Sequence, residues 1–194
     1  MHNAMALPLD GAPATTSDES ALVLAARHDA SAFGTLYLRY LDRVYWYLRA
    51  RTPSEEDAAD LTQQVFLQAL AALPCYRQHS VPFTAWLFRI ARNVAIDFQR
   101  RRRATVAWDA LPEGWRAGAL PDLEHAAMRA EAIDRLRTLL AQLDAEKREL
   151  LALRFAAGLT VAEIAVVIGK SEAATKKQLA RLVQSLKEKY RDPS

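Results

Sequence analysis

Apolar residues recur every three or four positions along nearly the whole chain, the spacing that gathers them on one face of an α-helix. Between residues 19 and 51 the pattern breaks near Asp29, which predicts a short helix and then a longer one. Pro53 ends that run, Ser54 can cap the next helix, and three carboxylates follow where a helix start is positive. This third helix ends at Pro74. Because no stretch alternates as a strand would, the sequence predicts an all-α fold.

The stretch WLFRIARNVAIDFQRRRR, residues 86–103, predicts a further helix with an apolar stripe from Leu87 to Phe98. The composition changes after it. Residues 104–121 contain Pro112, Gly114, Gly118 and Pro121, which is typical of a linker between domains. This linker also carries Trp108 and Trp115, which either pack on the adjacent domains or dock on something else.

A second helical region follows the linker. The pattern predicts a long amphipathic helix to about residue 143, a shorter one over 144–157, and a break at Gly158. Thr160 and Glu163 have the spacing of a capping box, Gly169 ends that helix, and Ser171 caps the last one, over 172–189. The predicted architecture is two small helical domains on a flexible linker: a tail at 1–18, a first domain at 19–103, the linker at 104–121 and a second domain at 122–194.

The last two helices are joined by a short turn that contains a glycine, and the second helix carries basic residues, which is the pattern of a helix-turn-helix. Small and basic side chains on the outer face of the final helix would let it enter a major groove. The alternative is an ordinary helical hairpin with a solvated lysine face. The candidate duplex-binding residues are the cap and the outward or flanking positions: Ser171, Ala173, Lys176, Lys177, Ala180, Arg181 and Gln184.

Helix 86–103 carries a second polar row, on a different face from its apolar stripe. An indole, an amide, a carboxylate and guanidinium groups in one row can stack on an unpaired base, read its edges and hold its backbone. The loop at 75–80 could wall a pocket for that base. The alternative is a polar face with a half-buried tryptophan. The candidate residues are Trp86, Arg89, Asn93, Asp97, Arg100 and Arg101.

Charge favours a phosphate-bearing partner for this helix. The whole chain has a formal net charge of only +3, yet residues 86–103 hold six arginines and one aspartate. A membrane anchor is disfavoured, because no apolar run approaches the roughly 18 residues of a span and no signal peptide opens the chain. Cys75 is the only cysteine, which excludes an intrachain disulfide and fits a reducing cytoplasm. We find no nucleophile–base pair, phosphate loop or metal-ligand spacing, so we expect no enzyme activity, metal or cofactor.

Three segments in register resemble one known family. Residues 60–70 (DLTQQVFLQAL), residues 83–93 (FTAWLFRIARN) with Asp97 and the arginine run, and residues 153–160 (LRFAAGLT) through Ser171-Glu172 are similar to motifs of extracytoplasmic-function sigma factors. The resemblance covers nearly the whole chain, apart from the tail and most of the linker.

The resemblance implies a cytoplasmic, dissociable subunit of bacterial RNA polymerase that recognises −10 and −35 promoter elements and promotes melting. The helix at 86–103 would open the −10 element and place a non-template base beside Asn93, and the last helix would read the −35 element. The polymerase contacts would be the clamp of the large catalytic subunit and the flap of the other large subunit, and an anti-sigma factor would be a further partner. The implied clamp-binding residues are Asp57, Asp60, Leu61, Gln63, Gln64, Phe66 and Leu67.

The sequence departs from the family pattern at four positions. Gln64 and Gln68 stand where the family has a charged pair, which leaves the docking electrostatics open. Thr175 replaces a common valine and Gln178 a common arginine, a loss that could weaken −35 recognition. A helix-turn-helix regulator that never engages polymerase remains the alternative, and the 60–70 match argues against it.

Overall fold

The computed structural model describes residues 16–77, 81–105 and 135–191, and its regular elements are all helical. The all-α prediction is therefore confirmed for this part of the chain. Outside the described residues lie most of the predicted tail, residues 106–121 of the predicted linker with Trp108 and Trp115, and residues 122–134.

The first domain contains α1 (Thr16–Ala25), α2 (Ala30–Arg49), α3 (Glu55–Ala72), the 3₁₀ turn η1 (Leu73–Cys75) and α4 (Phe83–Thr105). The second contains a helical stretch at 135–141, α6 (Ala145–Leu151), η2 (Ala152–Ala156), α7 (Val161–Ile168) and α8 (Glu172–Arg191).

Local side-chain chemistry sets the helix ends, and the ends at Ser54, Thr160 and Gly169 are those that the sequence predicted. Asp29 caps α2, and the Ser54 hydroxyl accepts a hydrogen bond of 3.0 Å from the backbone N–H of Asp57 at the start of α3. Thr160 and Glu163 form the predicted capping box of α7. Gly169 ends α7 with a φ of 72°, a left-handed conformation that glycine adopts without a Cβ penalty.

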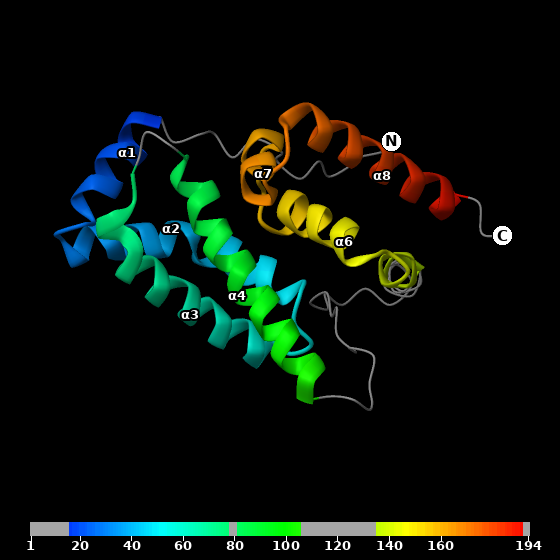
Figure 1. The fold of residues 1–194 in the computed structure, drawn as a ribbon, viewed down its shortest axis with the longest axis horizontal. Coiled ribbons are helices and arrows are strands. Elements are labelled where there is room, and N and C mark those ends of the chain that lie inside the picture. The colour runs from blue at the N-terminus through cyan, green and yellow to red at the C-terminus, as the bar shows by residue number, and fades with distance from the viewer. Residues whose placement is uncertain (1–15, 78–80, 106–134, 192–194) are drawn as a thin grey trace, which may run out of the picture.

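Helices α2, α3 and α4 pack on one another and enclose the core of the first domain (Figure 1). Three residues of the apolar stripe predicted for α4 lie in this core: Leu87, Ala91 and Val94 are at most 2% exposed. Helix α1 is attached through a polar contact, in which the Tyr40 hydroxyl bonds Glu19 and lies 3.1 Å from the Thr84 hydroxyl. Burial raises the pKa of Tyr40 above its usual range, because a charged phenolate would be poorly solvated there.

The structure divides the helix predicted over residues 144–157. Asp144 caps α6, but the next segment, η2, is a π-helix closed by a 2.9 Å bond from the Ala157 N–H to the Ala152 carbonyl. The wider turn keeps Leu153 buried and leaves Phe155 65% exposed. The chain then turns at Gly158, whose φ is 65°.

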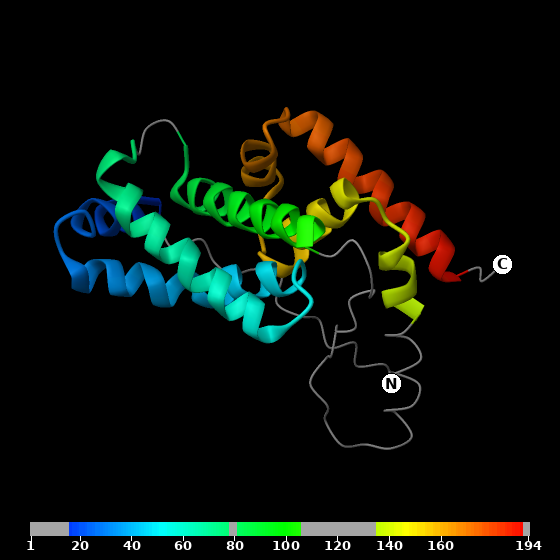
Figure 2. The ribbon, with the colours of Figure 1, turned by 60° about the horizontal axis from the view of Figure 1, so that its bottom comes forward.

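The two domains lie side by side, with α4 against α7 and α2 against η2 (Figures 1 and 2). Buried apolar side chains form one contiguous cluster that extends from Val23 in α1 to Leu182 in α8. The described chain is therefore a closed arrangement of two helical units.

Candidate nucleic-acid and polymerase interfaces

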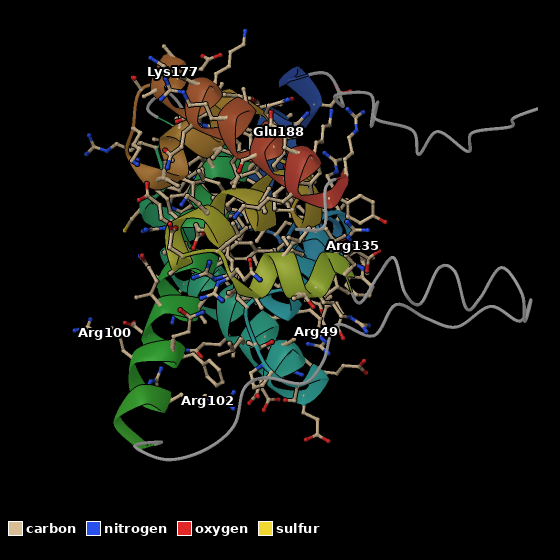
Figure 3. The ribbon with its side chains drawn as sticks, turned by 90° about the vertical axis from the view of Figure 1, so that its right-hand side faces the viewer. Arg49, Arg100, Arg102, Arg135, Lys177 and Glu188 are labelled. Carbon is tan, nitrogen blue, oxygen red and sulfur yellow. The ribbon has the colours of Figure 1, made fainter. Side chains whose placement is uncertain are left out.

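Helix α4 presents the predicted polar row at its surface. Arg89, Asn93, Asp97 and Arg100 are all exposed, and the opposite face of the helix is in the core. Arg101 is exposed as well, and its Nε donates to the Asp97 carbonyl at 3.4 Å. Figure 3 shows Arg100 and Arg102 at the lower end of α4 and Lys177 at the far end of the molecule on α8. The two cationic surfaces thus belong to different domains.

Trp86 opens the row but is only partly exposed. Its ring lies 4.9 Å from that of Tyr76 and 5.4 Å from that of Phe83, in tilted arrangements. Tyr76 is buried, and its hydroxyl donates to the Val81 carbonyl at 2.6 Å. This residue of the loop predicted to wall a base pocket is therefore part of the hydrophobic core. Residues 78–80 of that loop lie outside the described residues. One edge of Trp86 is therefore packed, and its remaining surface is what a base could contact.

Arg89 makes a contact that sequence reasoning did not predict. Its Nε and Nη2 donate to the backbone carbonyl of Val166 in α7, at 3.1 and 2.8 Å. The acceptor is near the C-terminal end of the first helix of the helix-turn-helix, where carbonyls carry partial negative charge. In this arrangement the guanidinium is occupied by the second domain.

Helix α8 has a buried face and, opposite it, the outer face that the sequence predicted. Thr175, Leu179 and Leu182 are buried. Tyr190, near the end of the helix, is 39% exposed, and the centroid of its ring lies 5.0 Å from the Arg135 guanidinium carbon. The seven candidate duplex-binding residues are all exposed: Ser171, Ala173, Lys176, Lys177, Ala180, Arg181 and Gln184.

The structure accounts for two of the four positions at which the sequence departs from the family pattern, Thr175 and Gln178. Thr175 is fully buried, and its hydroxyl donates to the Ser171 carbonyl at 2.9 Å, so the polar group is satisfied inside the helix. Gln178 turns away from the outer face: its amide donates to Glu146 at 3.0 Å and accepts from Lys170 at 3.2 Å. Hydrogen bonds from Lys170 and Gln178 lower the pKa of the Glu146 carboxyl. Gln178 thus braces α8 against α6.

The predicted clamp-binding residues of α3 divide between core and surface. Leu61 and Phe66 are 6% and 5% exposed, so their side chains belong to the core and are not available to a partner. Asp57 is half-buried and bonded to the Ser54 hydroxyl, and Gln64 is half-buried too. Asp60, Gln63 and Leu67 are exposed. Leu70, which was not among the predicted residues, is also 46% exposed. These four residues are spaced three or four positions apart, so they lie on one face of α3.

The sequence did not indicate a group of charged residues that lies between the two domains. Glu149 of α6 is buried and contacts Tyr47, Arg51 and Arg92 of the first domain. In the sequence these are ordinary charged positions on amphipathic helices, indistinguishable from solvated ones. No local signal marks them, since their partners are far away along the chain.

The described residues contain no cluster of three potential metal ligands. No helix in the same residues is long and apolar enough to cross a membrane.

Comparison with known proteins identifies both domains. Residues 36–105 match the family model for sigma-70 region 2, and residues 133–186 match that for sigma-70 region 4. The chain is 33% identical over 180 residues to the ECF RNA polymerase sigma factor BldN of Streptomyces coelicolor, an alignment that covers 90% of this chain and 67% of BldN. It is 38% identical over 149 residues to the ECF sigma factor SigD of Mycobacterium tuberculosis, covering 73% of this chain and 69% of SigD.

A solved structure of CnrH in complex with the cytosolic domain of CnrY has a similar fold. It superposes with a TM-score of 0.64 at 28% identity, covering 87% of this chain and 94% of CnrH. Sigma factors are not enzymes, so the expectation of a non-catalytic protein agrees with the family. A regulator that never engages polymerase does not fit a match to both sigma regions. The chain therefore belongs to the ECF family of RNA polymerase sigma factors and directs RNA polymerase to promoters for transcription initiation.

Proposed function

We propose that this sigma factor divides its task among three surfaces. Helix α8 reads the −35 element in the major groove through its exposed face, centred on Lys177 and Arg181. Helix α4 opens the −10 element, and α3 docks on the clamp of the large catalytic subunit of polymerase through Asp60, Gln63 and Leu67. The second domain contacts the flap of the other large subunit. The observation that carries this division is the exposure of each surface on a helix whose other side is in the core.

Strand opening depends on the α4 row. A non-template base leaves the duplex and stacks on the accessible part of Trp86, with Asn93 beside it to bond its edge. Asp97 adds an acceptor to the same row, and Arg100 and Arg101 neutralise the backbone phosphates. The exposure of Asn93, Asp97 and Arg100 along one face supports this role.

We extend the proposal to the domain limits and the partners. The first domain takes residues 19–103 and the second 122–194, with a linker at 104–121 that crosses the polymerase. The protein acts in the cytoplasm, where polymerase and promoters are found. We also propose an anti-sigma factor as a regulatory partner. Its support is that the similar protein CnrH was solved bound to a second protein, the cytosolic domain of CnrY.

Run-off transcription tests the proposal as a whole. The full chain is added to bacterial core polymerase with a library of promoter fragments from its own genome. We expect discrete transcripts that core polymerase alone does not make. A folded preparation that yields none would refute the proposed function. A matching pull-down should retain core polymerase in stoichiometric amount.

Replacing Trp86 with alanine is expected to impair promoter opening more than polymerase binding, because a stacked base is worth about 1–3 kcal/mol. Reactivity of unpaired thymines to permanganate measures opening, and a pull-down of core polymerase measures docking. Trp46→Ala is the matched control, since Trp46 is 55% exposed on α2 and outside the three surfaces. Equal loss of opening and docking would instead assign Trp86 to the core with Tyr76 and Phe83.

A further inference from the structure

Tyr76, whose ring lies against Trp86, is held by three hydrogen bonds. Its backbone N–H donates to the Leu73 carbonyl at 3.1 Å, and its hydroxyl donates to the Val81 carbonyl at 2.6 Å. Its own carbonyl accepts a hydrogen bond from the Arg27 guanidinium. Leu73 and Val81 belong to the same segment that joins α3 to α4, whereas Arg27 lies 49 residues before Tyr76, in the turn between α1 and α2. Arg27 therefore ties this segment to a different part of the domain.

The position of the Tyr76 ring restricts that of the Trp86 ring. Their centroids are 4.9 Å apart, and Phe83 completes a cluster of three, with its ring 5.8 Å from Tyr76 and 5.4 Å from Trp86. Tyr76 and Phe83 are buried, and Trp86 is half-buried at the edge of the cluster. Because packed rings share their contact surfaces, a displaced Tyr76 would free the Trp86 ring to change its rotamer. An unpaired base would then meet a ring that is no longer oriented for stacking.

A second contact of α1 reaches the other end of the same segment. Glu19 accepts a hydrogen bond from the Tyr40 hydroxyl, which also lies 3.1 Å from the Thr84 hydroxyl in the first turn of α4. Figures 1 and 2 show α1 beside η1 and the start of α4. Helix α1 and the turn after it therefore hold both ends of the segment that lies against Trp86, at Tyr76 through Arg27 and at Thr84 through Tyr40.

Stability of the fold does not by itself account for an arginine at this position. The Arg27 Nε is buried and has no hydrogen-bond partner among the described residues. Removing a guanidinium N–H from water without giving it a partner lowers the free energy of unfolding. A charged donor does, however, make a stronger hydrogen bond to a carbonyl than a neutral donor makes, which suits a contact that has to keep a ring in place.

We propose that Arg27 is a positioning residue for promoter opening: by holding the Tyr76 carbonyl, it fixes the Trp86 ring in the orientation that receives the unpaired non-template base. This inference rests on the proposed function of α4. Arg27 acts through Tyr76 and not on the DNA. The affinity that one base contributes therefore depends on Arg27, whereas the affinity for phosphates and for polymerase does not.

Binding of single-stranded oligonucleotides to the holoenzyme tests this role. The probe is the non-template −10 strand of a promoter identified by run-off transcription, together with copies that lack one base at each position in turn. In the parent holoenzyme, we expect the loss of one particular base to weaken binding about tenfold, the size of effect expected for a base stacked on an aromatic ring. In Arg27→Gln and Arg27→Met, the same missing base should weaken binding only about twofold, with the other positions unchanged. Arg27→Lys keeps a charged donor and should restore the loss to about fivefold.

A double variant and a matched control show whether Arg27 acts through Trp86. In a Trp86→Ala background, we expect Arg27→Gln to change the base-dependent affinity by less than about twofold, because residues in one chain of contacts are not additive. Arg39→Gln is the control, since it makes the same charge change at an exposed position of α2. It should behave as the parent. Circular dichroism measures whether each variant folds, and a pull-down measures its binding to core polymerase.

Several results would overturn the positioning role of Arg27. These are a base dependence in both Arg27 variants as large as in the parent, an equal decrease in Arg39→Gln, and losses that add to those of Trp86→Ala. Failure of both Arg27→Gln and Arg27→Met to fold would assign the residue to stability and overturn the role too. The proposed function of α4 fails differently: a parent holoenzyme that initiates transcription but shows no base-dependent position would refute base capture by Trp86, and the role of Arg27 with it.

Discussion

Leu67→Asp is expected to reduce the affinity for core RNA polymerase by roughly tenfold to a hundredfold and to leave the fold intact. Leu67 is 68% exposed, so little of it supports the core, and a charge at this position is solvated in the free protein. On docking, the leucine would be buried against the clamp, and burying such a side chain contributes about 1.5–3 kcal/mol. The Leu67→Asp variant lacks that contribution, and docking would also remove water from the charged carboxylate, which weakens binding further. Equilibrium binding of the purified chain to core polymerase measures the difference.

Leu38→Asp is the control for this experiment. Leu38 is 73% exposed on α2, so the substitution makes the same chemical change at a similarly exposed site outside the proposed docking surface. We expect its affinity for polymerase to stay within about twofold of the parent. Equal losses in both variants would show that α3 is not the specific contact. An unchanged affinity in Leu67→Asp would remove Leu67 from the docking surface.

Neutralising Lys177 and Arg181 together is expected to give the second large effect, on duplex binding. Each phosphate that a protein neutralises contributes about 0.9 to the slope of log affinity against log salt concentration. The double variant Lys177→Gln, Arg181→Gln should therefore show a slope shallower by about two. If either side chain also bonds a guanine, a further 1–3 kcal/mol or so of sequence preference disappears.

The same helix offers a matched control in Lys189→Gln, Arg191→Gln. This pair also removes one lysine and one arginine, but from the last turn of α8. At about 1.5 Å of rise per residue, Arg191 lies about 15 Å along the helix from Arg181. We expect a smaller change in slope, because the N-terminal part of a recognition helix enters the groove. An equal change of slope in both double variants would indicate a diffuse electrostatic effect. An unchanged slope in the Lys177→Gln, Arg181→Gln variant would show that these two side chains do not contact phosphates.

Two of the departures from the family pattern now have a physical account. The sequence suggested that Gln178 loses a cation needed for −35 recognition. In the structure its side chain bonds Glu146 and Lys170 within the second domain, so it orients α8 and does not lie on the exposed face. Thr175 keeps the burial expected of the valine that it replaces, since its hydroxyl is satisfied by Ser171.

Helix α3, which we propose as the docking helix, shows where a sequence pattern was insufficient. Apolar residues of α3 occur on more than one side, because the helix packs against both α2 and α4. The pattern could not tell which of Leu61, Phe66 and Leu67 would remain outside. Burial of the first two and exposure of the third follow from the positions of the neighbouring helices.

What the sequence by itself determined was local. The Ser54 cap, the capping box at Thr160 and the end of α7 at Gly169 depend on residues within four positions of one another, so a linear pattern contains them. Helical periodicity alone places the residues of the α4 row on one face, and does the same for the outer residues of α8. Only the tertiary structure decided the partners of Glu149 and Arg89. Tyr47 and Glu149 are 102 residues apart, and Arg89 and Val166 are 77 apart. A charge that is buried by a distant segment has the same local sequence as one that faces water.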